Sequence, residues 1–149
     1  MRGLKDKMVI VTGGGGGIGG ATCRRFAQEG AKIAVFDIDA AAAERTASSI
    51  AGGAARAFAC DITDHAAVAR TVAAAEETLG PVGVLVNNAG WDVFRLLKDS
   101  TPEEWQKLIS INLVGALNMH HAVLPGMLAR RTGRIVNIAS ERRPGRLLR

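Results

Sequence analysis

The eight residues that directly follow a short apolar segment have the composition of a phosphate-binding loop. Residues 13–20 contain seven glycines and Ile18, and they directly follow the β-branched, apolar residues 7–12. Glycines let the backbone turn tightly and approach a pyrophosphate, and a helix that begins just after them offers free N–H groups to the anion. Gly15, Gly17 and Gly20 fit the pattern G-x-G-x-x-G. Gly13, Gly17 and Gly19 fit the wider pattern G-x-x-x-G-x-G. It predicts a dinucleotide site, with a flexible glycine loop as the alternative.

A carboxylate ends the next apolar segment. Asp37 is the last residue of 32–37, and it could accept hydrogen bonds from both hydroxyls of an adenosine ribose. The same charge would repel a 2′-phosphate, and residues 13–20 contain no Lys or Arg to offset that repulsion. We therefore expect NAD as the cofactor rather than NADP. A solvated aspartate at a strand end is the alternative, and Asp39 is a neighbouring candidate.

Strand-like and helix-like segments alternate around these residues. Apolar segments rich in β-branched residues predict buried strands at 7–12, 32–37, 56–60, 82–87 and 134–139. Helical patterns between them predict helices at 21–28, 40–50, 64–79 and 101–131. Asp64 and Thr101 are expected N-caps, and Pro125 is expected to kink the last helix. Five alternations predict a doubly wound α/β fold with a parallel, Rossmann-like sheet.

Composition and length exclude several classes of protein. The chain has 149 residues, 48% of them apolar and 22% charged, which is typical of one globular domain. It contains no uninterrupted apolar stretch of about 18 residues, so we expect no membrane partner. The first residues show no apolar segment with a cleavage site, so we expect no secretory leader. Cys23 and Cys60 have no metal-ligand spacing and suit a reducing compartment. A cytoplasmic location and no metal site are expected.

The net charge of +5 could indicate a nucleic-acid partner, but its distribution argues against one. Residues 130–149 contain seven arginines and one acid, Glu141, so they carry +6 and residues 1–129 carry −1. A nucleic-acid-binding domain would spread basic residues over a face of the fold. We therefore expect no nucleic-acid partner.

Five segments in order resemble the short-chain dehydrogenase/reductase family. They are Thr12-Gly13-x-x-x-Gly17-x-Gly19, Cys60-Asp61-Ile62, Asn87-Asn88-Ala89-Gly90, Asn112 and residues 135–140. The resemblance covers residues 7–140, which is only the first part of a member's usual length. It implies that residues 1–140 form an NAD-binding Rossmann domain that is truncated after the fifth strand.

The resemblance implies a role for each matching residue. The residues that would contact NAD are Gly13, Gly17, Ile18, Gly19, Asp37, Asp61, Ile62, Asn88, Ala89 and Gly90. The glycine loop would hold the pyrophosphate, Asp37 the ribose, and Asp61 with the Ile62 backbone the adenine. Asn87 would tie strands together instead.

Two further matches imply catalytic roles. Asn112 would kink the long helix and hold a water in a proton relay, and Ser140 would hydrogen-bond the substrate's carbonyl or hydroxyl. Without the resemblance, Asn112 could be a buried asparagine whose amide has hydrogen-bond partners, and Ser140 could be a loop serine without a catalytic role. The family's base is a tyrosine that, counted from Ser140, would fall beyond Arg149, with a lysine that lowers the phenol pKa. Because the sequence contains no tyrosine, we expect this chain to be inactive alone.

The family implies NAD-dependent oxidation of a secondary alcohol to a ketone. A closer resemblance of residues 19–30, 90–94 and 120–127 to one member implies an alicyclic, CoA-linked alcohol. Trp91 and Phe94 would wall its ring pocket or serve as ordinary packing, and His120 and His121 are expected at a surface or subunit contact. The alternatives are a 3-oxoacyl or sugar-alcohol reductase, a non-catalytic dinucleotide-binding module, or a pseudogene product. Full-length relatives are expected to be homodimers or homotetramers.

Residues 141–149 do not resemble the family. Their sequence is Glu-Arg-Arg-Pro-Gly-Arg-Leu-Leu-Arg, and removing one nucleotide from a consistent codon string restores a family-like segment. We interpret this atypical basic tail as the product of a frameshift, with a genuine short paralogue as the alternative.

Overall fold

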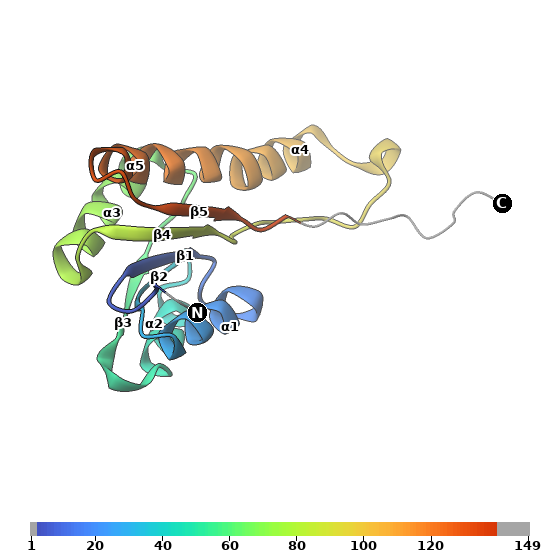
Figure 1. The fold of residues 1–149 in the computed structure, drawn as a ribbon. Helices are drawn as coiled ribbons and strands as arrows, with labels where there is room; N and C mark the ends of the chain where they lie inside the picture. Colours follow the sequence, from blue (N-terminus) through green and yellow to red (C-terminus); the bar gives the residue numbers. More distant parts are fainter. Residues whose placement is uncertain (1–2, 140–149) are drawn as a thin grey trace.

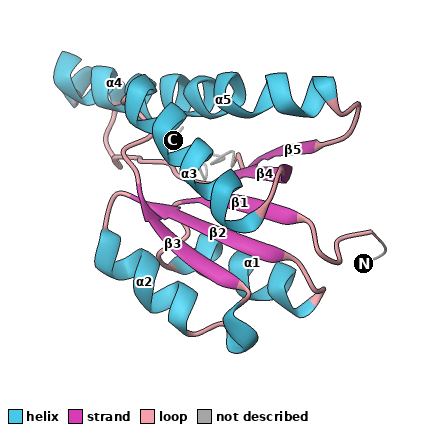
Figure 2. Ribbon diagram, turned by 90° about the vertical axis from the view of Figure 1, so that its left-hand side faces the viewer, coloured by secondary structure: helices cyan, strands magenta, loops and turns pink. Residues whose placement is uncertain are grey.

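The computed structural model describes residues 3–139, which form three layers with a parallel sheet between two layers of helices (Figures 1 and 2). The strands are β1 (Met8–Thr12), β2 (Lys32–Asp37), β3 (Ala55–Ala59), β4 (Val82–Asn87) and β5 (Arg134–Asn137). Their order is β3-β2-β1-β4-β5, and every neighbouring pair is parallel. The expected doubly wound sheet is thus confirmed. The strand order reverses between β1 and β4, where such sheets bind ligands at the carboxyl ends of their strands.

The three inner strands β1, β2 and β4 are buried on both faces, which explains why they read as continuous apolar runs. The expectation of a buried strand at 134–139 is wrong, because β5 lies at the edge of the described sheet, ends at Asn137 and is mostly exposed. Along β1, Met8 and Ile10 belong to the core on one face, whereas Val9 and Val11 belong to the core on the other. All five residues of this strand are buried. The central strand therefore holds the two helical layers together.

Two groups of helices cover the sheet. On one face lie α1 (Gly17–Gln28), α2 (Ala40–Ser48) and the 3-10 turn η1 (Ala51–Gly53). The 3-10 turn η2 (Leu97–Asp99) lies in the segment between β4 and α4 (Pro102–Ile109). On the other face lie α3 (His65–Leu79), α4, the π-helical segment η3 (Ser110–Gly115) and α5 (Ala116–Ala129). The last three form one long helix that Figure 1 shows running over β4 and β5.

The expected capping residues are confirmed. Asp64 accepts hydrogen bonds from the amides of Ala66 and Ala67 at the start of α3. Thr101 and Glu104 form a capping box at the start of α4, where each side chain pairs with the other's backbone amide. These side chains satisfy amides that the first turn of a helix leaves without partners.

Some boundaries differ from those expected. Helix α1 begins at Gly17 rather than residue 21, because the amide of Gly20 already donates to Gly16 O in spite of glycine's low helix propensity. The long helix ends at Ala129 and contains the π-helical segment, which the apolar pattern could not show. Pro125 lies inside α5.

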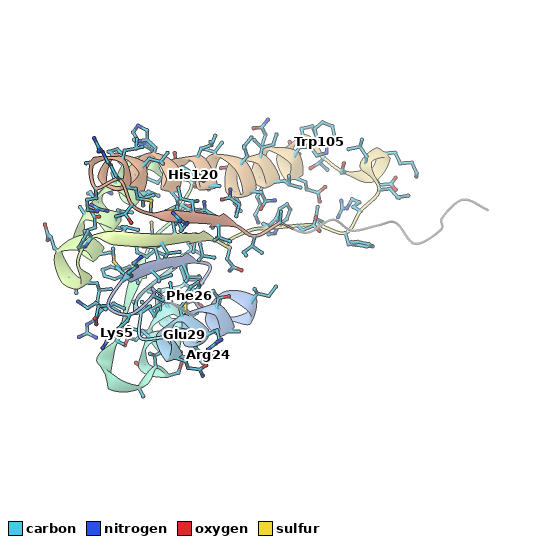
Figure 3. All side chains as sticks on the ribbon, in the orientation of Figure 1. Lys5, Arg24, Phe26, Glu29, Trp105 and His120 are labelled. Carbon is cyan, nitrogen blue, oxygen red and sulfur yellow. The ribbon has the colours of Figure 1, made fainter. Side chains whose placement is uncertain are left out.

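The long helix leaves much apolar surface uncovered. Met119, Val123 and Met127 pack against the sheet, whereas Leu117 and Leu128 are exposed, the latter to 72%. Figure 3 shows side chains projecting from this helix on the side away from the sheet. Within the described residues, Pro102–Ala129 is also the one helix whose length and composition would suffice to cross a membrane. Core helices of globular proteins have the same length and composition, so the absence of a membrane partner stays a prediction.

We predict that the 149-residue chain self-associates through this uncovered face. Each large apolar side chain left in water forgoes about 1.5–3 kcal/mol, which favours its burial between molecules. Replacing two exposed leucines together, Leu117→Lys with Leu128→Lys, should shift the chain toward monomer in size-exclusion chromatography with light scattering. The pair Gln106→Lys with Ala129→Lys adds the same charge to exposed sites of the same helix and should leave association unchanged. A wild-type chain that is a stable monomer would contradict the prediction.

We also predict that both thiols are unreactive in the folded chain. Burial raises the pKa of Cys23 from 9.0 to about 12, and it raises the pKa of Cys60 as well. For Cys23 this lowers the reactive thiolate fraction at a fixed pH by a factor of about 1,000. A thiol reagent at pH 8 should label two cysteines per chain in denaturant and none within minutes in buffer.

Because the folded-state pKa of Cys23 is raised, the contribution of its neutral thiol to the free energy of unfolding should be present below pH 9 and decline toward pH 12.

Candidate functional site

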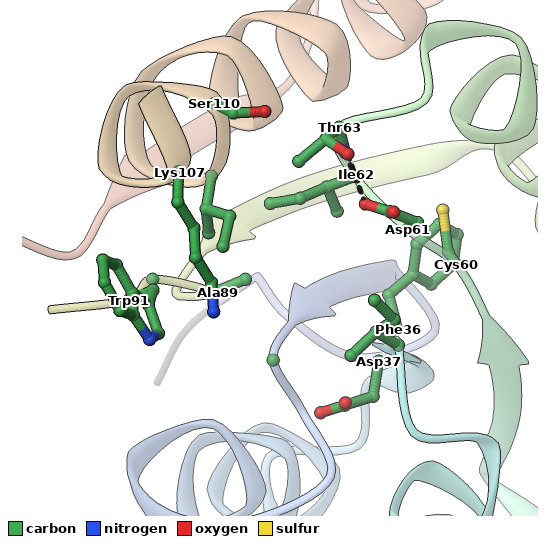
Figure 4. Close-up of a pocket in the computed structure, with 14 residues that line it drawn as sticks. Phe36, Asp37, Cys60, Asp61, Ile62, Thr63, Ala89, Trp91, Lys107 and Ser110 are labelled. Atoms are coloured by element: carbon green, nitrogen blue, oxygen red, sulfur yellow. Dashed lines mark hydrogen bonds between the residues drawn. The ribbon is translucent and has the colours of Figure 1, made fainter. Parts of the chain in front are cut away.

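A cavity of about 570 Å³ opens at the carboxyl ends of β1, β2 and β4, beneath the start of the long helix (Figure 4). Six of the residues expected to contact NAD line this cavity: Gly13, Asp37, Asp61, Ile62, Ala89 and Gly90. They come from four separate segments of the chain and meet because parallel strands end at one edge of the sheet. The position is the one where open α/β sheets bind ligands.

The glycine loop is built by close contacts between backbones. Gly13 has φ +62° and lies so near the β4 loop that a Cβ there would be 2.9 Å from Ala89 Cα. A Cβ on Gly19, in the first turn of α1, would lie 2.0 Å from Gly13 O. No side chain therefore fits between the loop and the helix. The N-terminus of α1 carries no side-chain cap, so its first amides can bind an anion.

The Thr12 hydroxyl joins β1 to the loop after β4. It accepts hydrogen bonds from the backbone amides of Asn88 and Ala89, both at 3.0 Å, and donates to Val86 O at 3.4 Å. The Asn88 side chain donates in return to Thr12 O at 3.0 Å and to Gly13 O at 3.2 Å. Asn88 thus reaches back to the glycine loop. These bonds fix the separation of the two loops at the point where the strand order reverses.

Asp37 is held rigidly at the rim of the cavity. One carboxylate oxygen accepts from the amide of Gly15 at 2.8 Å and the other from the amide of Asp39 at 3.0 Å. The first bond ties β2 directly to the glycine loop. The neighbouring candidate, Asp39, serves a different purpose, because its carboxylate caps α2 by accepting from Ala42 N at 3.0 Å.

The wall next to Asp37, at the end of β3, is formed by Asp61, Ile62 and Thr63. Asp61 Oδ1 accepts from the amide of Thr63 at 2.9 Å and from its hydroxyl at 2.7 Å, the contact drawn in Figure 4. The buried amide of Asn118, on α5, donates to Ile62 O at 2.9 Å and to Thr63 O at 3.3 Å. The wall is therefore attached to the long helix by hydrogen bonds rather than by apolar packing alone.

Asn112 clamps the loop after β4. It lies in the π-helical segment η3, and its carboxamide pairs with the backbone of Trp91, accepting from the amide and donating to the carbonyl, both at 2.8 Å. Lys107, one turn earlier, places its ammonium 4.4 Å from the centre of the Trp91 ring and also lines the cavity. The side-chain amide proposed for a proton relay is thus engaged with backbone. The π-helical turn gives the interruption of the helix that the resemblance implied.

The remaining expected residues lie around the cavity rather than in its wall. Ile18 is 68% exposed, and Gly17 and Gly19 form the first turn of α1. Asn87 donates to Asn137 Oδ1 at 2.9 Å and so ties β4 to β5. Ser140 lies outside the described residues.

Three residues that contribute to the site were not singled out from the sequence. They are Lys107, Asn118 and the hydroxyl of Thr12, which the sequence offered only as the start of a motif. An asparagine within the apolar residues of α5 was a detectable signal, because a buried amide requires partners. The contact between Lys107 and Trp91 had no such signal.

The comparisons with known proteins agree with this geometry. Residues 7–143 match the family described as short chain dehydrogenase. The 2-(S)-hydroxypropyl-CoM dehydrogenase 3 of Xanthobacter autotrophicus is 39% identical over 139 residues, which are 92% of this chain and 54% of that protein.

Two solved structures extend the agreement to the fold. The crystal structure of NAD+-bound xylitol dehydrogenase matches with a TM-score of 0.88 and 36% identity, over 93% of this chain and 55% of that one. The 3-ketoacyl-(acyl-carrier-protein) reductase of Brucella melitensis, complexed with NADH, matches with a TM-score of 0.86 and 35% identity. The match covers 92% of this chain and 58% of the reductase. The chain spans about half the length of these relatives. Together, the matched residues and the shared fold show that this chain belongs to the short-chain dehydrogenase family.

Proposed function

We propose that this chain binds NAD(H) in the cavity at the sheet edge and forms the cofactor-binding part of a dehydrogenase that oxidises a secondary alcohol to a ketone. The observation that carries the proposal is the Asp37 carboxylate, which two backbone amides hold at the rim of the cavity beside the glycine loop. A carboxylate oxygen has further lone pairs after accepting one amide, so both oxygens can still accept from ribose hydroxyls. The family match and two neighbours that hold NAD+ or NADH support the same conclusion.

The residues present fit a dinucleotide. The close approach of Gly13 and Gly19 would be blocked by any side chain, and it leaves the uncapped start of α1 open to a pyrophosphate. Asp61 and the backbone of Ile62 form the wall that would face the adenine. When bound, NAD supplies the acceptor for the hydride. The work of this chain's own residues is to bind the cofactor and to exclude a 2′-phosphate.

The proposal extends to the class of substrate. Residues 90–94, 120–127 and 19–30 resemble 2-hydroxycyclohexanecarboxyl-CoA dehydrogenase, which points to an alicyclic alcohol carried as a CoA thioester. Trp91 supplies an aromatic face at the cavity and Lys107 a positive charge beside it, which suits an apolar ring joined to an anionic carrier. Phe94 is 77% exposed and does not line the cavity, so its part in a ring pocket has less support.

A second candidate is a dinucleotide-binding module without catalysis. The 149 residues include no tyrosine, and the resemblance assigns the proton-accepting role to that residue type. A 3-oxoacyl or sugar-alcohol reductase is the alternative within the family. The expected oligomeric state, the cytoplasmic location, the division at residue 140 and the frameshift interpretation of residues 141–149 stay predictions.

Substituting Asp37 tests the proposed preference for NADH over NADPH. We expect the chain to bind NADH at least tenfold more tightly than NADPH, as measured by titration of cofactor fluorescence. Asp37→Asn removes the charge that repels the 2′-phosphate and weakens the hydrogen bonds to ribose, so NADH affinity should fall about tenfold while the preference over NADPH shrinks to a few-fold.

A matched control lies two residues away. Asp39→Asn makes the same change of charge, and asparagine is as good an N-cap as aspartate, so α2 should keep its cap and the NADH preference should remain. Equal or tighter NADPH binding by the wild-type chain would overturn the cofactor assignment. Loss of the preference in Asp39→Asn alone would transfer the role from Asp37 to Asp39.

A turnover assay separates the two candidates. We expect the 149-residue chain to bind NADH yet produce none from NAD+ and 2-hydroxycyclohexanecarboxyl-CoA, because it offers no tyrosine to accept the hydroxyl proton. Absorbance at the NADH band measures the rate, and cofactor titration of the same sample shows that the site is folded. Turnover clearly above that of Ser140→Ala would show that another group acts as the base.

A further inference from the structure

Two histidines meet on the surface outside the dinucleotide cavity. His65 is the first residue of α3 and His121 lies on α5, and Nε2 of the first is 3.2 Å from Nδ1 of the second. Their ring centres are 5.0 Å apart, and the ring planes are inclined by 50°. Both side chains are exposed, and neither lines the cavity. The pair is therefore free of the cofactor site and open to solvent.

The separation of the two nitrogens matches that of two ligands on one metal ion. Imidazole nitrogens bind zinc at about 2.0–2.1 Å, and two of them at tetrahedral or right angles are then about 2.9–3.3 Å apart. In the structure the two nitrogens share a hydrogen bond, and metal binding would replace the shared proton once the exposed rings turn so that both lone pairs point to the ion. Neutral imidazole suits zinc, copper and nickel.

One carboxylate lies beside the pair. Asp64 precedes His65, and its carboxylate accepts the backbone amides of Ala66 and Ala67 at the start of α3. This charge offsets the positive end of the α3 dipole, which would otherwise disfavour a cation there. Among residues 3–139, no group of three or more His, Cys, Asp and Glu side chains gathers to hold a metal. The histidines would thus be the two protein ligands, with water completing the coordination.

We propose that His65 Nε2 and His121 Nδ1 chelate one divalent transition-metal ion of the zinc, copper and nickel class, which bridges α3 and α5. A metal ion between His65 and His121 would also strengthen the attachment of α5 near the cavity wall. Asn118, one turn before His121, holds the carbonyls of Ile62 and Thr63 in the cavity wall. A metal ion would add a second tie between the same helix and the segment that follows this wall.

Calorimetric titration with zinc at pH 7.5, on the tag-free 149-residue chain, tests the proposal. We expect one zinc ion per chain, and at least tenfold weaker binding in both His65→Ala and His121→Ala, because either change leaves a single protein ligand. His120→Gln is the matched control, since it removes the third histidine of the chain, the neighbour of His121, and keeps the pair. Its affinity for zinc should stay within twofold of wild type.

Thermal melting guards against effects on folding. A ligand that binds only the folded state raises the melting temperature, so zinc should raise it for wild type and His120→Gln and leave it unchanged for each single variant of the pair. Each variant is compared with itself without zinc, so a general loss of stability does not affect the result. Unchanged zinc affinity in His65→Ala or His121→Ala, or no saturable binding by wild type, would overturn the proposal.

Discussion

The close approach of two backbones at the ends of β1 and β4 is the constraint on which the cavity depends. Gly13 and Gly19 lie where no side chain fits, and the Thr12 hydroxyl holds the loop after β4 against them by accepting two amides. The buried hydroxyl donates one hydrogen bond and accepts two, so its full hydrogen-bonding capacity is used. The distance between the glycine loop and the wall formed by Ala89 and Gly90 is therefore set by covalent geometry and hydrogen bonds, not by a ligand.

The position of Asp37 follows from the same constraint. The amide of Gly15 can reach the carboxylate only because the glycine loop turns back toward β2, where a Cβ on Gly15 would lie 2.7 Å from the carboxylate oxygen. A carboxylate held by amides needs no reorganisation to receive ribose hydroxyls, and hydrogen bonds to charged groups are worth about 1.5–3 kcal/mol each. The hydrogen bond from Gly15 therefore links the position of the Asp37 carboxylate, which we propose to exclude a 2′-phosphate, to the loop that we propose to hold the pyrophosphate.

Features set by local sequence could be predicted, whereas features set by contacts between distant segments could not. Periodicity predicted five strands and their parallel pairing, and the end of a strand marked Asp37 as a candidate, whereas Asp61 was indicated only by the family resemblance. The start of α1 and the π-helical turn at Asn112 depend on what the backbone meets in three dimensions, so propensity misplaced the first and missed the second. Side-chain pairs such as Lys107 with Trp91 or His65 with His121 join elements whose relative rotation no sequence pattern specifies.

The long helix shows how one element can serve the site without supplying its chemistry. Asn112 clamps the Trp91 backbone and Asn118 holds the carbonyls of Ile62 and Thr63, so two carboxamides nearly two turns apart attach the helix to opposite walls of the cavity. The apolar residues Met119, Val123 and Met127 fix the helix to the sheet beyond them. A helix held by apolar packing alone could slide or rotate among similar arrangements, but directional hydrogen bonds at two points select one register. The π-helical segment Ser110–Gly115 contains Asn112 and precedes Asn118, so its wider turn contributes to the rotation between the two carboxamides.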